Sequence, residues 1–177
     1  MSRAAALGVT LATTYPHLVE KLVLVGTPPS VTATAESPGI DQTFWQHVVS
    51  LIEAGDYERA MPLFWAREFS EPDSSDLAKT FVRASLEMPR EVFRVFFTVP
   101  DPGRDIRHLL PAVRVPTLVL HGEEDRVVPV EAGRWVARQI PGAQFYAFKG
   151  CGHMPAFTAP AEFARVVRDF LRPPRAV

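Results

Sequence analysis

Two stretches of the sequence decide the fold: Leu118-Val-Leu-His-Gly-Glu-Glu-Asp125-Arg-Val-Val-Pro129 and Gly150-Cys-Gly-His153-Met-Pro155. Each follows or contains an apolar run rich in strand-forming residues, the second run covering residues 143–148. Asp125 and His153 are therefore expected just past the carboxyl ends of strands, where an open α/β sheet builds its ligand crevice. A carboxylate that orients an imidazole, which in turn deprotonates a nucleophile, forms the second half of a catalytic triad.

These motifs resemble the α/β-hydrolase family, in which the chain order is nucleophile, acid and then histidine. The segment Pro116–Pro129 is similar to the strand and loop that carry the triad acid, which implies that role for Asp125. The segment Gly150–His153 is followed by a Pro-initiated amphipathic helix at residues 160–171, which implies that His153 is the base. The resemblance covers the C-terminal part of the fold, from the nucleophile turn onward.

The family carries its nucleophile in G-x-S-x-G, on a sharp turn from a strand into a helix. Here a small-residue helix that ends at Tyr15-Pro16 and a strand over Val19–Gly26 resemble the helix and strand that come after that turn in the family, and the family spacing counted back reaches Ser2. The resemblance implies that Ser2 is the nucleophile and that the backbone N–H of Arg3 is one oxyanion-hole donor. Ala4 departs from the motif by replacing its last glycine with the next smallest residue. In the competing interpretation, Ser2 belongs to a frayed terminus.

The resemblance also predicts that the chain is truncated at its N-terminus. The strand that leads into the turn and the loop with the second oxyanion donor would precede Met1, and an upstream codon for glycine would complete the motif. Without that strand, the edge of Lys21–Val25 is expected to be exposed and to promote self-association. Two functions stay open: an esterase-like serine hydrolase whose activity is impaired by the truncation, and a non-catalytic remnant or interaction module of the same fold.

Composition limits the class of protein. The 177 residues are 47% hydrophobic with a formal net charge of −1, which is typical of a globular domain and gives no electrostatic case for nucleic acid or an anionic membrane as partner. The sequence has neither an apolar stretch of membrane-spanning length nor the start of a signal peptide, so we expect a cytoplasmic protein. A single Cys151 excludes an internal disulfide. It could be a nucleophile paired with His153, but a small buried thiol is the favoured interpretation.

Residues 31–104 contain no convincing strand and predict an all-helical cap, inserted into a core made of residues 1–30 and 105–177. The expected fold is thus a partial α/β-hydrolase fold, with parallel strands flanked by helices and a helical cap. Apolar spacing predicts cap helices over residues 42–53, 57–68, 75–87 and 90–97, with an N-cap at residues 74–75 for the third. The cap is rich in aromatic residues, among them Phe44, Trp45, Phe64, Trp65, Phe69, Phe81, Phe93, Phe96 and Phe97. Most are expected to form the core of the cap, and a minority to line the crevice for a small apolar ester or acyl substrate.

Other polar residues are assigned structural roles. His121 lies within the first motif, where packing and hydrogen bonding are the expected role, and Glu123 and Glu124 could compete with Asp125 as the acid. Isolated histidines, namely His17, His47 and His108, are expected at the surface. No spacing of His, Asp and Glu predicts a metal site, and there is no phosphate-binding glycine loop, so we expect neither metal nor cofactor.

Overall fold

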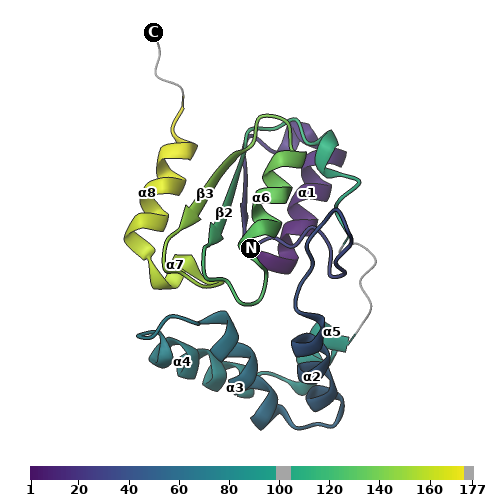
Figure 1. The fold of residues 1–177 in the computed structure, drawn as a ribbon, viewed down its shortest axis with the longest axis vertical. Coiled ribbons are helices and arrows are strands. Elements are labelled where there is room, and N and C mark those ends of the chain that lie inside the picture. The colour runs from purple at the N-terminus through teal and green to yellow at the C-terminus, as the bar shows by residue number, and fades with distance from the viewer. Residues whose placement is uncertain (99–104, 174–177) are drawn as a thin grey trace.

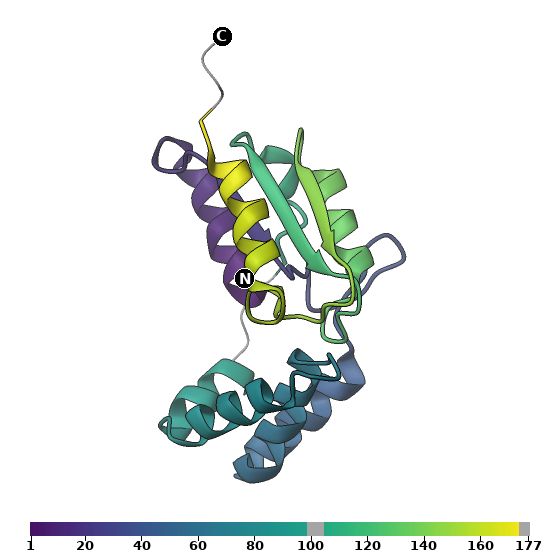
Figure 2. The same cartoon turned by 90° about the vertical axis from the view of Figure 1, so that its left-hand side faces the viewer.

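A computed structural model describes residues 1–98 and 105–173 and has two parts: a small α/β sandwich and a helical lobe beneath it (Figures 1 and 2). The predicted segment 99–104, at the end of the cap, lies outside the described residues. None of the described helices is long and apolar enough to cross a membrane.

The sheet has three parallel strands in the order β1 (Leu22–Val25), β2 (Thr117–Gly122) and β3 (Gln144–Phe148). Each of the three lies where the sequence predicted a strand. The central strand β2 is buried along its whole length, which explains why its sequence is a continuous apolar run rather than an alternating one. In the register, Leu24 aligns with Val119. Because β2 and β3 are also parallel, the loops that follow them leave the sheet at the same end.

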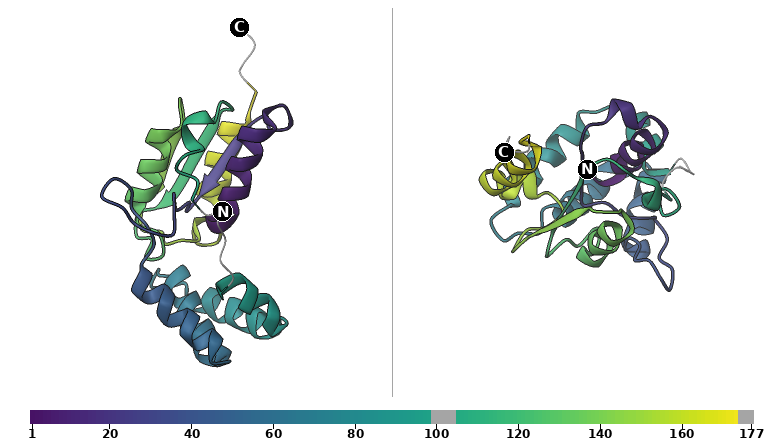
Figure 3. Two further views of the ribbon diagram at one scale, coloured as in Figure 1. Left: turned by 90° about the vertical axis from the view of Figure 1, so that its right-hand side faces the viewer. Right: turned by 90° about the horizontal axis from the view of Figure 1, so that it is seen from above.

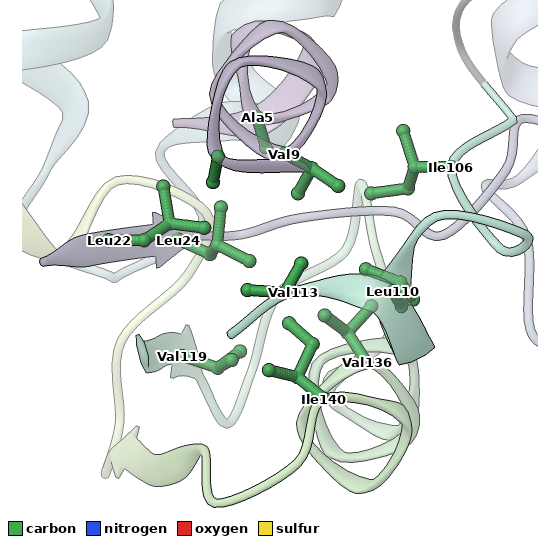
Figure 4. Packing of buried hydrophobic residues seen from close by; sticks show 11 residues of the cluster. Ala5, Val9, Leu22, Leu24, Ile106, Leu110, Val113, Val119, Val136 and Ile140 are labelled. Atoms are coloured by element: carbon green, nitrogen blue, oxygen red, sulfur yellow. The ribbon is translucent and has the colours of Figure 1, made fainter. Parts of the chain in front are cut away.

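Helices α1 (Ala5–Thr14) and α6 (Val130–Gln139) cover one face of the sheet (Figure 4). Side chains alternate along a strand, so Val119 points into this layer while its neighbours on β2 point to the other. The buried residues of the layer are Ala5, Val9, Ala12, Leu22, Leu24, Ile106, Leu110, Val113, Val119, Val136 and Ile140. Short 3-10 turns at Pro16–Leu18 and Leu110–Ala112 precede β1 and β2.

The opposite face of the sheet is covered by α8 (Pro160–Leu171), which follows the short helix α7 (Pro155–Thr158). Val166 and Phe163 of α8 pack against Phe148 and the β2 leucines. The strands are thus enclosed by helices on both faces, as parallel strands require.

The lobe consists of α2 (Gln42–Glu53), α3 (Tyr57–Glu68), α4 (Ser75–Leu86) and α5 (Arg90–Thr98). Asp41 and Asp56 cap α2 and α3 by accepting bonds from the backbone N–H of Phe44 and Arg59. Ser74 stands at the predicted N-cap of α4, but its hydroxyl donates to the carbonyl of Glu71 rather than capping the helix. The predicted helix bounds otherwise agree with the observed ones to within one residue.

The lobe has its own apolar cluster and faces the carboxyl ends of the strands (Figures 2 and 3). Among the described residues between Val25 and Thr117, none joins the sheet as a strand. The division into a core and a cap remains our interpretation of this arrangement.

Candidate active site

Asp125 and His153 lie on the loops that follow β2 and β3, and their side chains are in contact. The Asp125 Oδ2 to His153 Nδ1 distance is 2.6 Å, and both side chains are buried. Gly122, at the end of β2, allows the two loops to approach this closely, because a Cβ there would lie 2.0 Å from the carbonyl oxygen of Gly152. The two residues are therefore brought together as the sequence predicted.

The Asp125 carboxylate is fixed by further hydrogen bonds. Its Oδ1 accepts from the backbone N–H of Val127 at 2.8 Å and of Val128 at 2.9 Å, and Nε2 of His121 lies 3.1 Å from Oδ2. Burial alone would raise the pKa of Asp125, but the hydrogen bonds from His121 and His153 outweigh it and hold the pKa well below its usual range. Asp125 is therefore a carboxylate at neutral pH.

His121 supports this carboxylate and takes no part in the cavity wall. Its Nε2 lies 2.8 Å from the carbonyl oxygen of Val128 as well as near Asp125, and both of these partners only accept hydrogen bonds. The network thus assigns the proton to Nε2 and leaves Nδ1 without a partner. This agrees with the packing and hydrogen-bonding role expected for His121.

The other ring nitrogen of His153 is unpaired, because its Nε2 has no hydrogen-bond partner although the ring is only 1% exposed. Burial would lower the pKa of His153, but the charges of Glu68 and Asp125 outweigh it and raise the pKa above the ordinary value. Gly26, which follows β1 with a φ of 54°, packs against the ring, because a Cβ there would lie 2.8 Å from Cε1 of His153. A nucleophile would have to reach Nε2.

Ser2 begins the 3-10 turn Ser2–Ala4 that leads into α1, and its φ is 49°. It is the sole non-glycine residue with positive φ among those described, and a serine held in this uncommon conformation is what a sharp nucleophile turn requires. The N-terminus lies at the end of the sheet that faces the lobe (Figure 3). The amino group of Met1 is close enough for its charge to act on the pKa of His153. Ser2 is not hydrogen-bonded to Nε2.

A cavity of about 410 Å³ opens between the sheet and the lobe, with Ser2, Arg3 and Met154 in its wall. Six of the nine Phe and Trp residues named for the cap line it: Trp45, Phe64, Trp65, Phe93, Phe96 and Phe97. Our expectation that only a minority would face the crevice is wrong. Rings that pack against each other in the cluster of the lobe also turn a side toward the cavity.

The alternative candidates do not meet at this site. Glu123 and Glu124 are exposed, whereas Asp125 is buried against His153. Burial raises the pKa of the Cys151 thiol, which disfavours the thiolate that a cysteine nucleophile needs. His17, His47 and His108 are exposed. Within the described residues no cluster of His, Cys, Asp and Glu could hold a metal ion.

Sequence reasoning missed one residue of the site, Glu68. This last residue of α3 is buried, lines the cavity and places Oε2 at 3.7 Å from Nε2 of His153. Burial raises the pKa of Glu68 to about 7. In the sequence it is one more acidic residue at the end of an amphipathic helix, so only the packing of the lobe on the sheet reveals it.

Comparison with known proteins identifies the family. A sequence profile described as the alpha/beta hydrolase fold matches residues 1–160. The chain belongs to the α/β-hydrolase fold family. It is 32% identical to a 2-hydroxymuconate semialdehyde hydrolase from Pseudomonas putida, over 96% of this chain and 60% of that protein. It is 26% identical to a pimeloyl-[acyl-carrier protein] methyl ester esterase from Aromatoleum aromaticum, over 92% of this chain and 68% of that protein.

Solved structures of the family show the same fold. An enol-lactonase from Burkholderia xenovorans superposes with a TM-score of 0.81 at 20% identity, over 97% of this chain and 63% of that one. A bromoperoxidase from Bacillus anthracis also gives 0.81, at 22% identity, over 97% of this chain and 65% of that one. The chain thus spans about 60 to 68% of the length of the relatives named here.

Proposed function

We propose that this chain carries the catalytic half of a serine hydrolase that cleaves small apolar esters or related acyl compounds. Ser2 is the nucleophile, His153 the general base and Asp125 the residue that orients His153. The observation that carries the proposal is a Ser2 with positive φ in the wall of a cavity whose wall also contains Glu68, 3.7 Å from Nε2 of the His153 that Asp125 orients.

The reaction follows from the state of each group. Asp125 accepts a hydrogen bond from the Nδ1–H of His153. In the neutral ring Nε2 therefore carries a lone pair, which can accept the proton of the Ser2 hydroxyl. The Ser2 oxygen then attacks the carbonyl carbon, and the protonated ring returns that proton to the leaving alcohol. In this proposal the backbone N–H of Arg3 supplies one donor to the oxyanion, as the resemblance to the family implies. Water releases the acyl group by the same route in reverse.

The substrate class is inferred from the cavity. Its wall is dominated by apolar and aromatic side chains, and its volume of about 410 Å³ is in the range of small-molecule sites. The relatives are named for a methyl ester on an acyl-carrier protein and for semialdehyde or dienoate compounds, each of which contains a carbonyl carbon. An ester with a short apolar acyl chain fits both facts.

Turnover of 4-nitrophenyl butyrate by the chain and by Ser2→Ala tests the proposal. Loss of the nucleophile should reduce kcat by about a thousandfold or more, and the remaining rate should come from substrate binding and oxyanion stabilisation alone. The control is Ser50→Ala, which removes an exposed serine of α2. Equal background rates in all three proteins would favour the other candidate, a non-catalytic member of the same fold.

A further inference from the structure

Glu68 is the one acidic side chain among the described residues that line the cavity. It is 6% exposed, it ends α3, and it approaches His153 at Nε2, the nitrogen that exchanges protons in the proposed reaction. A buried carboxyl requires partners, because leaving it without a hydrogen bond in an apolar site costs free energy.

The separation of the two groups indicates what lies between them during the reaction. At 3.7 Å, Glu68 Oε2 and His153 Nε2 are too far apart for a direct hydrogen bond, and Nε2 has no other partner. Two polar atoms at this separation can share one water molecule, and a water in an apolar cavity needs at least two such partners to be held.

Neighbouring residues hold Glu68 in this place. Arg67 donates through Nε to the carbonyl of Arg126 at 2.8 Å, next to Asp125. The Oε1 atom of Glu71 accepts from the backbone N–H of Gly152 at 2.7 Å, next to His153. The last turn of α3 and the segment that follows it are thereby bonded to both loops of the site, so the position of Glu68 relative to His153 is set in advance rather than by the substrate.

We propose that Glu68 is the residue that positions the hydrolytic water against His153 once the acyl group has been transferred to Ser2. This inference rests on the proposed function. The water donates one proton to Nε2 and the other in a hydrogen bond to Glu68, while its oxygen attacks the acyl carbon. The tetrahedral intermediate collapses as the bond from carbon to Ser2 Oγ breaks, and Nε2 returns its proton to Oγ. The products are the free carboxylic acid and the regenerated serine.

The two halves of the reaction differ in the group that gives its proton to Nε2, and this difference makes the role of Glu68 specific to deacylation. During acylation Nε2 takes its proton from the Ser2 hydroxyl, which is fixed by the chain itself. During deacylation the proton comes from a free water molecule, whose orientation has to be supplied by a second group. A carboxyl retains an acceptor oxygen whether or not it is protonated, so this function does not depend on its charge.

Stopped-flow mixing with 4-nitrophenyl butyrate, followed by intact-mass detection of the butyryl-enzyme, separates the two steps. At a pH above the acidic limb set by His153, we expect Glu68→Leu to be acylated at the wild-type rate and deacylated about a hundredfold more slowly, so that a burst appears and kcat and KM fall together. Glu68→Gln retains an acceptor oxygen and should deacylate close to the wild-type rate. The matched control is Glu53→Leu, which changes the exposed last residue of α2.

The outcomes distinguish this inference from the proposed function. Equal loss in acylation and deacylation, or unchanged deacylation in Glu68→Leu, overturns the role of Glu68 while leaving the serine mechanism intact. If no butyryl-enzyme forms even in the wild type, the proposed function fails. A high-resolution crystal structure then decides the water site: a water within hydrogen-bond distance of both Glu68 and Nε2 supports it, and a direct contact between the two side chains overturns it.

Discussion

At the scale of single residues, the Asp125 carboxylate organises the site because all of its partners donate to it. Two backbone amides hold one oxygen, and His153 and His121 share the other. The bond to Nδ1 leaves Nε2 as the free nitrogen of His153. The carboxylate is held in place by the short loop after β2, whose backbone N–H groups donate to it. The chemistry of the site is therefore built largely from local structure.

That local origin explains which site residues the sequence could predict. Asp125 and His153 stand at strand ends within recognisable loops, so their meeting follows from a parallel sheet. The contact of Glu68 with His153 depends on how the helical lobe packs on the sheet, and no local pattern encodes that packing. The role of Ser2 rests on the spacing within a family motif, and a bare sequence cannot distinguish a strained turn from a free end.

The close contact between Gly26 and His153 gives a first prediction. Gly26→Ala should reduce the free energy of unfolding by about 1–2 kcal/mol for the positive φ alone, and should in addition displace the His153 ring. Gly142→Ala is the matched control, because its φ is 72° and no atom lies within 4 Å of an added Cβ. Urea unfolding and the ring resonances of His153 measure the two effects. Identical behaviour of the two variants would contradict a contact with the ring.

The charges around His153 predict the pH dependence of hydrolysis. Only the neutral ring accepts a proton, so the rate should rise with pH through the pKa of His153. Burial and the charge of the Met1 amino group lower this pKa, but Glu68 and Asp125 outweigh them and raise it above the ordinary 6.5. Removing the charge in Glu68→Gln should move this acidic limb to lower pH. The profile of kcat/KM against pH measures the shift, with Glu53→Gln as control. An unmoved limb would show that Glu68 carries no charge in the free enzyme, and an upward shift would contradict the predicted effect of its charge on His153.

At the scale of elements, the helices of the lobe were predictable because their apolar residues recur with the period of a helix. This spacing predicted their bounds. The caps at Asp41 and Asp56 were not predicted, and the one predicted cap, at residues 74–75, does not form. The aromatic lining of the cavity was underestimated because periodicity shows which face of a helix is apolar, and it does not show whether that face meets another helix or a cavity.

The hydrogen bond between Glu71 and Gly152, which joins the lobe to the loop after β3, gives a prediction at this scale. Glu71→Ala removes the acceptor of the Gly152 N–H, so the free energy of unfolding should fall by about 1–3 kcal/mol and the amide of Gly152 should exchange faster with solvent. Glu87→Ala, at the exposed end of α4, is the control. Hydrogen exchange read at Gly152 checks the contact directly. Protection that persists in Glu71→Ala would mean that the lobe is held to the sheet by other contacts.

At the scale of the whole molecule, the sequence identified the family and the order of the elements, because both follow from motifs at strand ends. The chain spans about 60 to 68% of the relatives compared with it, so their complete activity is a proposal for this protein. Within the described residues β1 pairs with β2 alone, which leaves one side of a mostly apolar strand at the edge of the sheet.

That edge leads to our last prediction, self-association through β1. Leu22 and Gly26 donate their backbone N–H groups toward β2, so by alternation the N–H of Val23 points away from the sheet and is available to another chain. Val23→Pro removes this donor without touching a bond to β2, and proline is tolerated at such an edge position. Sedimentation velocity over a range of concentrations should show oligomers in the wild type and a larger monomer fraction in the variant. Leu7→Ser serves as the control, because Leu7 on α1 is 74% exposed and offers a competing apolar surface. If Leu7→Ser rather than Val23→Pro restores the monomer, association occurs through the helical face and the sheet edge is not the interface.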